Sequence, residues 1–253
     1  MTDFAALHRT GAPLLLPNAW DHASARLLAA QGFAAVGTTS LGVAAAAGLP
    51  DGAAATRDET LRLALGLGSA PFALSVDAED GFSDDPAEVA AFARELWAVG
   101  AAGINLEDRL GSADRHAEKI AAVKAAAPGL FVNARTDTYW LGDGTGTLAR
   151  LRAYGAAGAD GVFVPGLADP AAIAALVRAL GASGDLPLNV LYSPTGPTVP
   201  DLTALGVRRI SLGSLLYRRA LGAAAEALTA VREGRAPAGP TPAYADVQAL
   251  SGG

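Results

Sequence analysis

Short apolar runs and longer amphipathic runs alternate along most of the chain. Brief apolar runs between turn residues are typical of strands buried on both faces, whereas helical spacing of apolar residues indicates helices packed on one side. The pattern predicts strands at residues 14–18, 34–40, 72–79, 103–107, 130–136, 161–165, 188–191 and 209–213. It predicts helices at residues 21–31, 56–67, 85–99, 115–127, 145–157, 169–180, 200–205 and 215–232.

Polar residues at the predicted helix starts support these boundaries. Asp21 is placed as an N-cap, and Pro86 and Pro170 stand at first helical positions, where a missing N–H costs nothing. Thr56 and Glu59 have the spacing of a capping box. We therefore expect each amphipathic run to begin sharply after the loop that precedes it.

Eight strand–helix units in succession predict an α/β fold, the (β/α)8 TIM barrel. The alternative is an open doubly wound sheet, which would carry GxGxxG after its first strand. The sequence there is Pro17-Asn18-Ala19-Trp20, which does not match. We expect one barrel domain over residues 1–233. Residues 234–253 form a C-terminal extension, with a Pro/Gly-rich connector and a short helix near residues 243–250.

Composition excludes several classes of function. The net charge is −6 and no basic cluster is present, which argues against a nucleic acid or an anionic membrane surface as partner. The chain has no cysteine, so disulfides, thiolate metal sites and a cysteine nucleophile are excluded. No signal-like segment or long apolar run is found, and we expect a cytoplasmic protein with a small-molecule partner.

The third predicted strand ends in a burst of carboxylates, Asp77-Ala78-Glu79-Asp80. Side chains alternate across a strand, so Asp77 and Glu79 are expected on one face, with Leu74 and Val76 on the other. Two neighbouring carboxylates repel each other unless a cation or a proton lies between them. The run predicts either a metal site or a solvated strand end.

The residues at neighbouring strand ends favour the metal site. Alternation of side chains along a strand places Asn105 on the same face as Glu107, and Asn133 on the same face as Arg135. The carboxyl ends of all strands meet at one mouth of a barrel. Asp51 lies in a loop at the same mouth. An oxygen-only ligand set suits Mg²⁺, or Mn²⁺, with several waters retained. Arg135 is suited to bind a substrate carboxylate.

Five motifs now carry a resemblance. They are Pro-Asn-Ala-Trp-Asp at 17–21, Gly-Leu-Pro-Asp at 48–51, Asp-Ala-Glu-Asp-Gly at 77–81, Leu-Glu-Asp at 106–108 and Ala-Arg-Thr-Asp at 134–137. Each motif alone is unspecific, but five in this order are specific. Over nearly its whole length the chain resembles the isocitrate lyase/phosphoenolpyruvate mutase superfamily.

This resemblance implies a barrel that binds Mg²⁺ and a 2-oxo carboxylate and makes or breaks a C–C or C–P bond beside it. It implies that Asp77 ligates the metal directly, while Asp51, Glu79 and Glu107 hold the metal's water ligands. It also implies a homodimer or homotetramer, often with the last helix swapped between subunits.

The substrate side of the expected site follows from the same resemblance. Arg135 would bind the substrate, and the backbone amides near Ser40 and Leu41 would hold its carboxylate. Asn189, at the end of the seventh predicted strand, is a further substrate-binding candidate. The expected catalytic residues are Arg135, Glu107 and Asp51.

One segment departs from the superfamily's pattern. Members that cleave isocitrate or methylisocitrate carry a Lys-Lys-Cys-Gly-His type segment after the fourth strand, and its Cys acts in acid–base catalysis. Here residues 109–116 read Arg-Leu-Gly-Ser-Ala-Asp-Arg-His, without Cys. The longer Lys- and Asn-containing gating loop of the mutase branch is not matched either. At His116 a surface or helix-capping role is favoured over a gate or general acid.

The function expected from this combination is a Mg²⁺-dependent lyase. It would cleave a C–C or C–P bond next to a 2-oxo acid or carboxylate, through an enolate intermediate. Oxaloacetate decarboxylation and a phosphonopyruvate hydrolase-like reaction are alternatives, and the missing Cys disfavours cleavage of a substituted malate or citrate. A non-catalytic 2-oxo acid binder is the alternative from another class.

Overall fold

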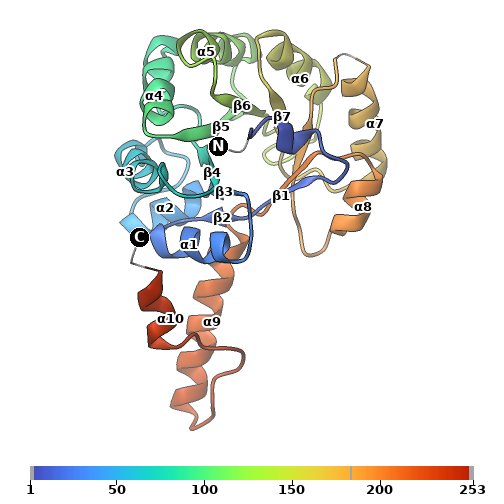
Figure 1. Cartoon of the computed structure of the whole chain (residues 1–253). Helices are drawn as coiled ribbons and strands as arrows, with labels where there is room; N and C mark the ends of the chain where they lie inside the picture. Colours follow the sequence, from blue (N-terminus) through green and yellow to red (C-terminus); the bar gives the residue numbers. More distant parts are fainter. Residues whose placement is uncertain (1–2, 183, 251–253) are drawn as a thin grey trace.

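The computed structural model describes residues 3–182 and 184–250, in which nine parallel strands form one sheet (Figure 1). The strands are Leu14–Leu16 (β1), Asn18–Ala19 (β2), Ala35–Thr38 (β3), Ala73–Asp77 (β4), Ala101–Glu107 (β5), Phe131–Arg135 (β6), Gly161–Val164 (β7), Leu188–Leu191 (β8) and Arg209–Ser211 (β9). Their order in the sheet is β1-β9-β8-β7-β6-β5-β4-β3-β2.

The sheet curls into a nearly closed barrel because its two edge strands are consecutive in the chain. β1 pairs with β9 and β2 pairs with β3, and only Pro17 separates β1 from β2. The side chain of Asn18 spans this seam. Its Nδ2 donates to the carbonyl of Thr38 at 2.7 Å, and its Oδ1 accepts from the amides of Leu212 and Gly213 at 3.0 and 2.8 Å. The predicted (β/α)8 architecture is confirmed, with the first strand interrupted at the proline.

Helices surround the barrel (Figure 1). They are His22–Ala30 (α1), Ser40–Ala47 (α2), Arg57–Leu67 (α3), Pro86–Ala98 (α4), Ala113–Ala126 (α5), Thr147–Ala156 (α6), Pro170–Gly181 (α7), Val199–Ala204 (α8), Leu215–Arg232 (α9) and Tyr244–Ala249 (α10), after a 3₁₀ turn at Ala6–His8 (η1). Aspartates cap three of them, since the side chains of Asp21, Asp85 and Asp169 accept from first-turn amides. The predicted cap at Asp21 is thus confirmed.

Three local predictions were wrong. The predicted strand over residues 34–40 ends at Thr38, and Ser40–Ala47 forms the helix α2, which we had not expected. β4 ends at Asp77, and Glu79 has a left-handed φ of 48°. Thr56 does not cap α3, because its hydroxyl donates to the carboxylate of Glu79 instead. At Thr56 and Glu79, contacts between residues distant in the sequence therefore override the conformation that the local sequence pattern predicts.

The barrel strands have an apolar outer face and a polar inner one. Leu74, Val76 and Ile104 pack in one buried cluster with helix residues such as Phe92, as alternation predicts. The inward parity carries Ser75, Asn105, Asn133, Asn189, Arg209 and Ser211, all buried. Outward burial of aliphatic side chains stabilises the shell, at about 25 cal/mol per Å² of apolar surface. The interior instead consists of a hydrogen-bonded polar layer beneath the barrel mouth.

The last long helix, α9, leaves the barrel, with α10 near it (Figure 1). Of its 18 residues only Ala230 is buried, while Leu221, Leu228 and Val231 are 55%, 61% and 63% exposed. The connector folds back toward it, with the Ala238 amide donating to Glu226 Oε2. Residues 244–249 are all exposed, so α10 does not pack on its own barrel. Among the helices of the described ranges, none is long and apolar enough to cross a membrane.

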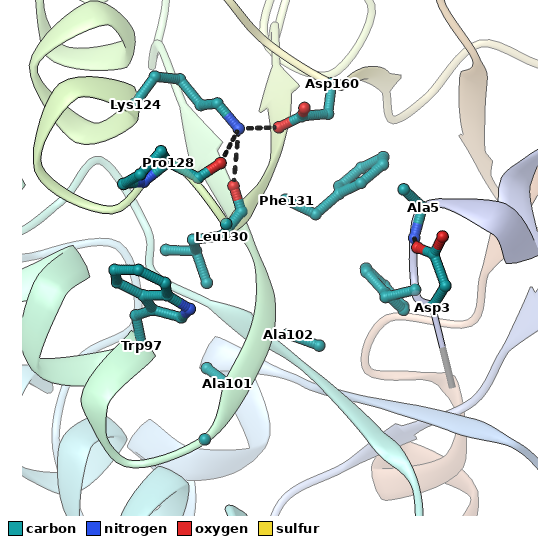
Figure 2. Close-up of a pocket in the computed structure, with 13 residues that line it drawn as sticks. Asp3, Ala5, Trp97, Ala101, Ala102, Lys124, Pro128, Leu130, Phe131 and Asp160 are labelled. Carbon is teal, nitrogen blue, oxygen red and sulfur yellow. Dashed lines mark hydrogen bonds and ion pairs between the residues drawn. The ribbon is translucent and has the colours of Figure 1, made fainter. Parts of the chain in front are cut away.

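A cavity of about 530 Å³ opens at the N-terminal end of the barrel strands (Figure 2). Ala101 and Phe131, the first residues of β5 and β6, line it, together with the exposed Trp97. Lys124 Nζ donates to Asp160 Oδ2 at 2.7 Å and to two backbone carbonyls, so this cation is already paired. Active sites of this fold lie at the opposite, C-terminal end.

Candidate active site

Asp77, the last residue of β4, is fixed by the segment that joins β3 to α2. Its backbone amide donates to Thr38 Oγ1 at 2.8 Å, and its Oδ2 accepts from the Ser40 amide at 3.3 Å. Ser40 is the first residue of α2, and helix N-termini favour negative charge. The carboxylate is therefore held at the barrel mouth, where Ser40 and Leu41 line the same pocket.

Glu79 is turned away from that pocket. Its carboxylate accepts from the Thr56 hydroxyl and from the Ala54 amide, and the residue is 2% exposed. Its backbone carbonyl accepts from the Glu107 amide at 2.8 Å. The prediction that Asp77 and Glu79 share one face of a strand was wrong, because the strand ends at Asp77.

Arg135, the last residue of β6, lies between two acids. Its Nη1 donates to Glu107 Oε2 at 2.8 Å, and its Nε donates to Asp137 Oδ1 at 2.7 Å. Glu107 and Arg135 are also paired in register between β5 and β6. Within the described residues no protein acceptor bonds Nη2. The guanidinium is thus rigidly held while keeping donors for a ligand in the pocket that it lines.

The pocket at the mouth has a volume of about 140 Å³, enough for a small carboxylic acid. One wall is polar and charged, with Asp51, Asp77 and Arg135. The other is apolar. Its lining includes Leu41, Trp140, Phe163, Pro165 and Leu191. The structure therefore brings Asp51, Asp77, Arg135, Ser40 and Leu41 together, as expected from the sequence.

Asn189 lies below the pocket and not in its wall. Its side chain exchanges hydrogen bonds with Ser211 at 3.0 and 3.3 Å, inside the barrel. Sequence reasoning missed three contributors: Asp137 as an Arg135 partner, Trp140 as a wall residue, and Arg209 in the interior. Arg209 shares its strand parity with Ser211, and that pattern could have revealed it.

Burial of so many acids raises their pKa values. Desolvation raises the pKa of Glu107 to about 8, against the opposing effect of Arg135 and with added repulsion from Asp77, Asp137 and Glu79. Burial likewise raises the pKa of Asp77, with Arg135 again opposing and Asp51 adding to the rise. Burial alone would lower the pKa of Arg135, but the surrounding acids raise it, so the guanidinium stays charged. The single positive charge of Arg135 is not enough to neutralise the negative charges of these carboxylates.

These residues fit a divalent cation held mainly through water. The available donors are carboxylate oxygens, which suit Mg²⁺ or Mn²⁺. In residues 3–182 and 184–250, no three acidic or histidine side chains form a ready cluster of direct ligands. Mg²⁺ usually keeps several waters and takes one or two carboxylates. Asp77 at the pocket wall suits a direct ligand, and Asp51, which lines the same pocket, suits a water-mediated contact. Glu107 does not line this pocket, because its carboxylate bonds Arg135 and it borders a separate cavity.

Residues 109–116 do not reach this pocket. Arg109 and Leu110 have φ of 46° and 58°, and Arg109 Nη1 contacts Asp80 at 3.2 Å. Ser112 caps α5, and His116 is buried at 3% exposure with its ring edge-on to Tyr154. The surface or capping role favoured for His116 was therefore wrong. His116 lines a separate cavity of about 320 Å³ that also touches Glu107.

Comparison with known proteins places this geometry in a family. An uncharacterized protein of Mycobacterium tuberculosis is 46% identical over 97% of this chain and 95% of its own length. The 2-methylisocitrate lyase of Halalkalibacterium halodurans is 29% identical, covering 85% of this chain and 74% of its own. The solved structure of a candidate lyase/mutase from Burkholderia cenocepacia superposes with a TM-score of 0.87 at 38% identity, covering 99% of this chain and 95% of that one.

The family model described as phosphoenolpyruvate phosphomutase matches residues 4–232, the whole barrel and α9. This span includes every acid of the mouth as well as Arg135. The chain therefore belongs to the phosphoenolpyruvate phosphomutase family, within the phosphoenolpyruvate mutase/isocitrate lyase superfamily.

Proposed function

We propose that this protein is a Mg²⁺-dependent lyase that cleaves a C–C bond, or a C–P bond, next to a 2-oxo acid or related carboxylate. Members of its superfamily are lyases and mutases that act on 2-oxo acids. One observation carries the proposal most directly: Asp77 and Arg135 line one small pocket, with Arg135 held by Glu107 and Asp137. This arrangement supports the proposal, because a carboxylate suited to bind a metal lies beside a fixed arginine suited to bind a substrate carboxylate.

Each residue of the pocket has a role in this proposal. Arg135 binds a carboxylate of the substrate through its remaining N–H donors and orients the oxo group toward Asp77. The first amides of α2, at Ser40 and Leu41, favour the same negative charge. Glu107 and Asp137 keep the guanidinium in place, so that little reorganisation accompanies binding.

The electronic demand of the reaction explains why positive charge is needed. In a 2-oxo acid, when the bond between C3 and its substituent breaks heterolytically, the electron pair stays on C3 and the oxo acid fragment becomes an enolate. The substituent leaves as an electron-poor group such as CO₂, and a proton from solvent then converts the enolate into the product. Mg²⁺ bound at Asp77 would supply Lewis-acid stabilisation of the enolate oxygen. Arg135 stabilises the carboxylate end of the same fragment. Loss of one such preorganised contact typically costs about 3 kcal/mol in the barrier.

The apolar wall bears on the choice of bond. The phosphonate group of a C–P substrate carries negative charge and is transferred as a phosphoryl group, which would need cationic partners. Arg135 is the single cationic side chain among the described residues that line the pocket. Trp140, Phe163 and Leu191 instead suit a carbon substituent. This observation favours C–C cleavage over C–P cleavage.

Screening for turnover with Mg²⁺ across oxaloacetate, substituted malates and phosphonopyruvate tests the proposal. We expect pyruvate, glyoxylate or another oxo acid as a product, and loss of turnover in chelator. Binding of oxo acids measured by calorimetry without any product would instead support the non-catalytic binder.

We propose in addition that α9 mediates self-association. Leu221, Leu228 and Val231 recur at helical spacing and are exposed in the single chain. A helix that buries one residue out of 18 gains its stability from a partner, and a second copy of the chain offers the same face. We also propose, from the sequence alone, that the protein is located in the cytoplasm.

A further inference from the structure

Asn105 on β5 lies at the floor of the substrate pocket, and its surroundings fix the orientation of its amide. It is paired in register with Asp77 of the neighbouring strand, is 6% exposed, and lines the same pocket as Asp77 and Arg135. A side chain at this position is therefore adjacent to the carboxylate that we assign to the metal.

The orientation of this amide follows from chemistry. Asn105 Oδ1 accepts from Asn133 Nδ2 at 2.8 Å and from Arg209 Nη2 at 3.1 Å. A guanidinium has donors only, so the Asn105 atom that faces Arg209 has to be the oxygen. The Nδ2 group is consequently directed away from Arg209. It donates to no protein group among the described residues.

Arg209 is a buried arginine without an acidic partner among the described residues, and its presence in the barrel interior calls for an explanation. It is 1% exposed, and no carboxylate pairs with it within the described part of the chain. It bonds neutral acceptors, with Nε to Ser211 at 3.1 Å and Nη2 also to Ser75 at 3.3 Å, while Nη1 has no partner. A buried and unpaired charge is costly, and a hydrophobic side chain could fill a barrel interior. Packing alone does not explain this arginine.

We propose that Asn105 Nδ2 donates a hydrogen bond to the substrate oxygen that gains charge in the reaction, and that Arg209 is the positioning residue that holds the amide in this orientation. The inference rests on the proposed function, because the oxygen belongs to a 2-oxo acid or its enolate. It adds a neutral donor beside Asp77, on the strand that lies between β4 with Asp77 and β6 with Arg135.

The substitution Asn105→Asp separates this role from a structural one. An aspartate has the same shape, and Arg209 beneath it becomes its ion-pair partner, so the thermal unfolding midpoint is expected to stay level or rise. The pocket then meets an acceptor oxygen in place of a donor. Calorimetry with Mg²⁺ and oxalate, a planar enolate-like dianion, is expected to show affinity reduced tenfold to a hundredfold. Mg²⁺ titrated alone should bind Asn105→Asp at least as well as wild type.

Two further variants test Arg209. Arg209→Met is expected to weaken oxalate binding about as much as Asn105→Asp, since the amide then loses its fixed orientation. Ser75→Ala is the matched control. It removes another hydrogen bond of Arg209, does not line the pocket and leaves Asn105 bonded, so oxalate affinity should stay within twofold of wild type. Should Arg209→Met fail to fold, Arg209→Gln takes its place, because a glutamine amide carries an acceptor as well as donors and no longer requires the Asn105 oxygen to face it.

The outcomes are distinguishable. Folded Asn105→Asp that binds oxalate within twofold of wild type overturns the inference. Absence of oxalate binding by wild type with Mg²⁺ overturns the proposed function and the ligand role of Asn105 together. In that case the ¹⁵N side-chain NMR signals of the ligand-free protein still test whether Arg209 fixes the orientation of the Asn105 amide. The Asn105 signals, identified by their loss in Asn105→Asp, should shift in Arg209→Gln and not in Ser75→Ala. Equal spectra of Arg209→Gln and wild type refute Arg209 as the positioning residue.

Discussion

Glu107 and Arg135 face each other across β5 and β6, with 2.8 Å between Oε2 and Nη1. Their side chains are 10% and 16% exposed, so this ion pair is largely withdrawn from water. Removing one member of such a pair leaves an uncompensated charge in a buried place, which is strongly destabilising. The pair therefore couples the stability of the barrel mouth to its capacity to bind an anion.

At about pH 9, above the pKa of about 8 of Glu107, Arg135→Met is predicted to destabilise the protein by about 3–5 kcal/mol, because the ionised Glu107 and Asp137 both lose their cation. The double variant Arg135→Met/Glu107→Gln should lose less, since one of the stranded acids is neutral. Urea unfolding of wild type, both single variants and the double variant measures the coupling. Additive effects would show that the two side chains do not interact energetically.

Arg135→Lys is predicted to keep the fold while losing oxo acid affinity. A lysine ammonium can pair with Glu107 or Asp137, but it lacks the planar fork that leaves further donors for a ligand. Calorimetry with Mg²⁺ and oxalate should show at least tenfold weaker binding. The surface variant Arg152→Lys serves as the matched control. Unchanged affinity in Arg135→Lys would contradict the assignment of Arg135 as carboxylate receptor.

Asp77→Asn is predicted to abolish metal-dependent turnover and to weaken Mg²⁺ binding, with a thermal midpoint equal to or above that of the metal-free wild type. The reason is that burial and neighbouring acids already disfavour the charged carboxylate, as its raised pKa indicates. Mg²⁺ titration by calorimetry, with Asp58→Asn on the exposed start of α3 as control, checks it. Full turnover of wild type in excess chelator would refute a metal role for Asp77 altogether.

The stability of the metal-free protein is predicted to fall as the pH rises from about 6.5 to 8. The pKa of Glu107 is raised from 4.5 to about 8, so the folded state keeps a proton that the unfolded state has released. Its stabilising contribution is complete below pH 4.5 and is lost as the pH passes 8. Burial lowers the pKa of His8 to about 3 and that of His116 to about 4, which opposes this trend only below about pH 6.5.

Thermal melts in chelator between pH 6.5 and 8 measure this effect, expected at no more than about 2 kcal/mol. Glu107→Gln should flatten the dependence, whereas Glu118→Gln, an exposed residue of α5, should leave it intact. Added Mg²⁺ should also flatten it, because the cation favours the ionised carboxylates. A melt that is equally pH-dependent in Glu107→Gln would assign the effect to other groups.

Leu228→Asp on α9 is predicted to convert an oligomer into a monomer with an intact barrel. A charge on the apolar stripe of α9 costs little in the free chain, where Leu228 is 61% exposed, and much in a buried contact between copies. Light scattering after size exclusion reports the mass, and Arg219→Asp tests whether added acid elsewhere on α9 has the same effect. A wild-type monomer at high micromolar concentration would contradict self-association through α9.

Local sequence patterns were most informative where one physical rule decides. Alternation and helical spacing predicted eight strand–helix units in the correct order, since a strand buried on both faces and a helix buried on one have different periods. The N-cap at Asp21 was predicted for a similar reason, because the helix and its cap are adjacent in the chain. Asp77 and Arg135 were found because each ends a strand, and strand ends share one rim.

Predictions that relied on extending a local rule beyond its element failed. Thr56 and Glu59 have capping-box spacing, yet the buried Glu79 carboxylate, distant in sequence, takes the Thr56 hydroxyl. Glu79 left the expected face because the chain turns at φ 48° after β4 ends. In both places a buried charge needs partners more than the helix or strand needs regularity.

The sequence by itself determined the barrel, its apolar outer face and the identity of the acids at its mouth, because these depend on residue type and short-range periodicity. Only the tertiary structure decided which acids line the pocket, that Arg135 lies between Glu107 and Asp137, and that Arg209 fixes the amide of Asn105. Those relationships join residues separated by up to 104 positions. They arise from the closure of the sheet, which brings distant strands to one rim.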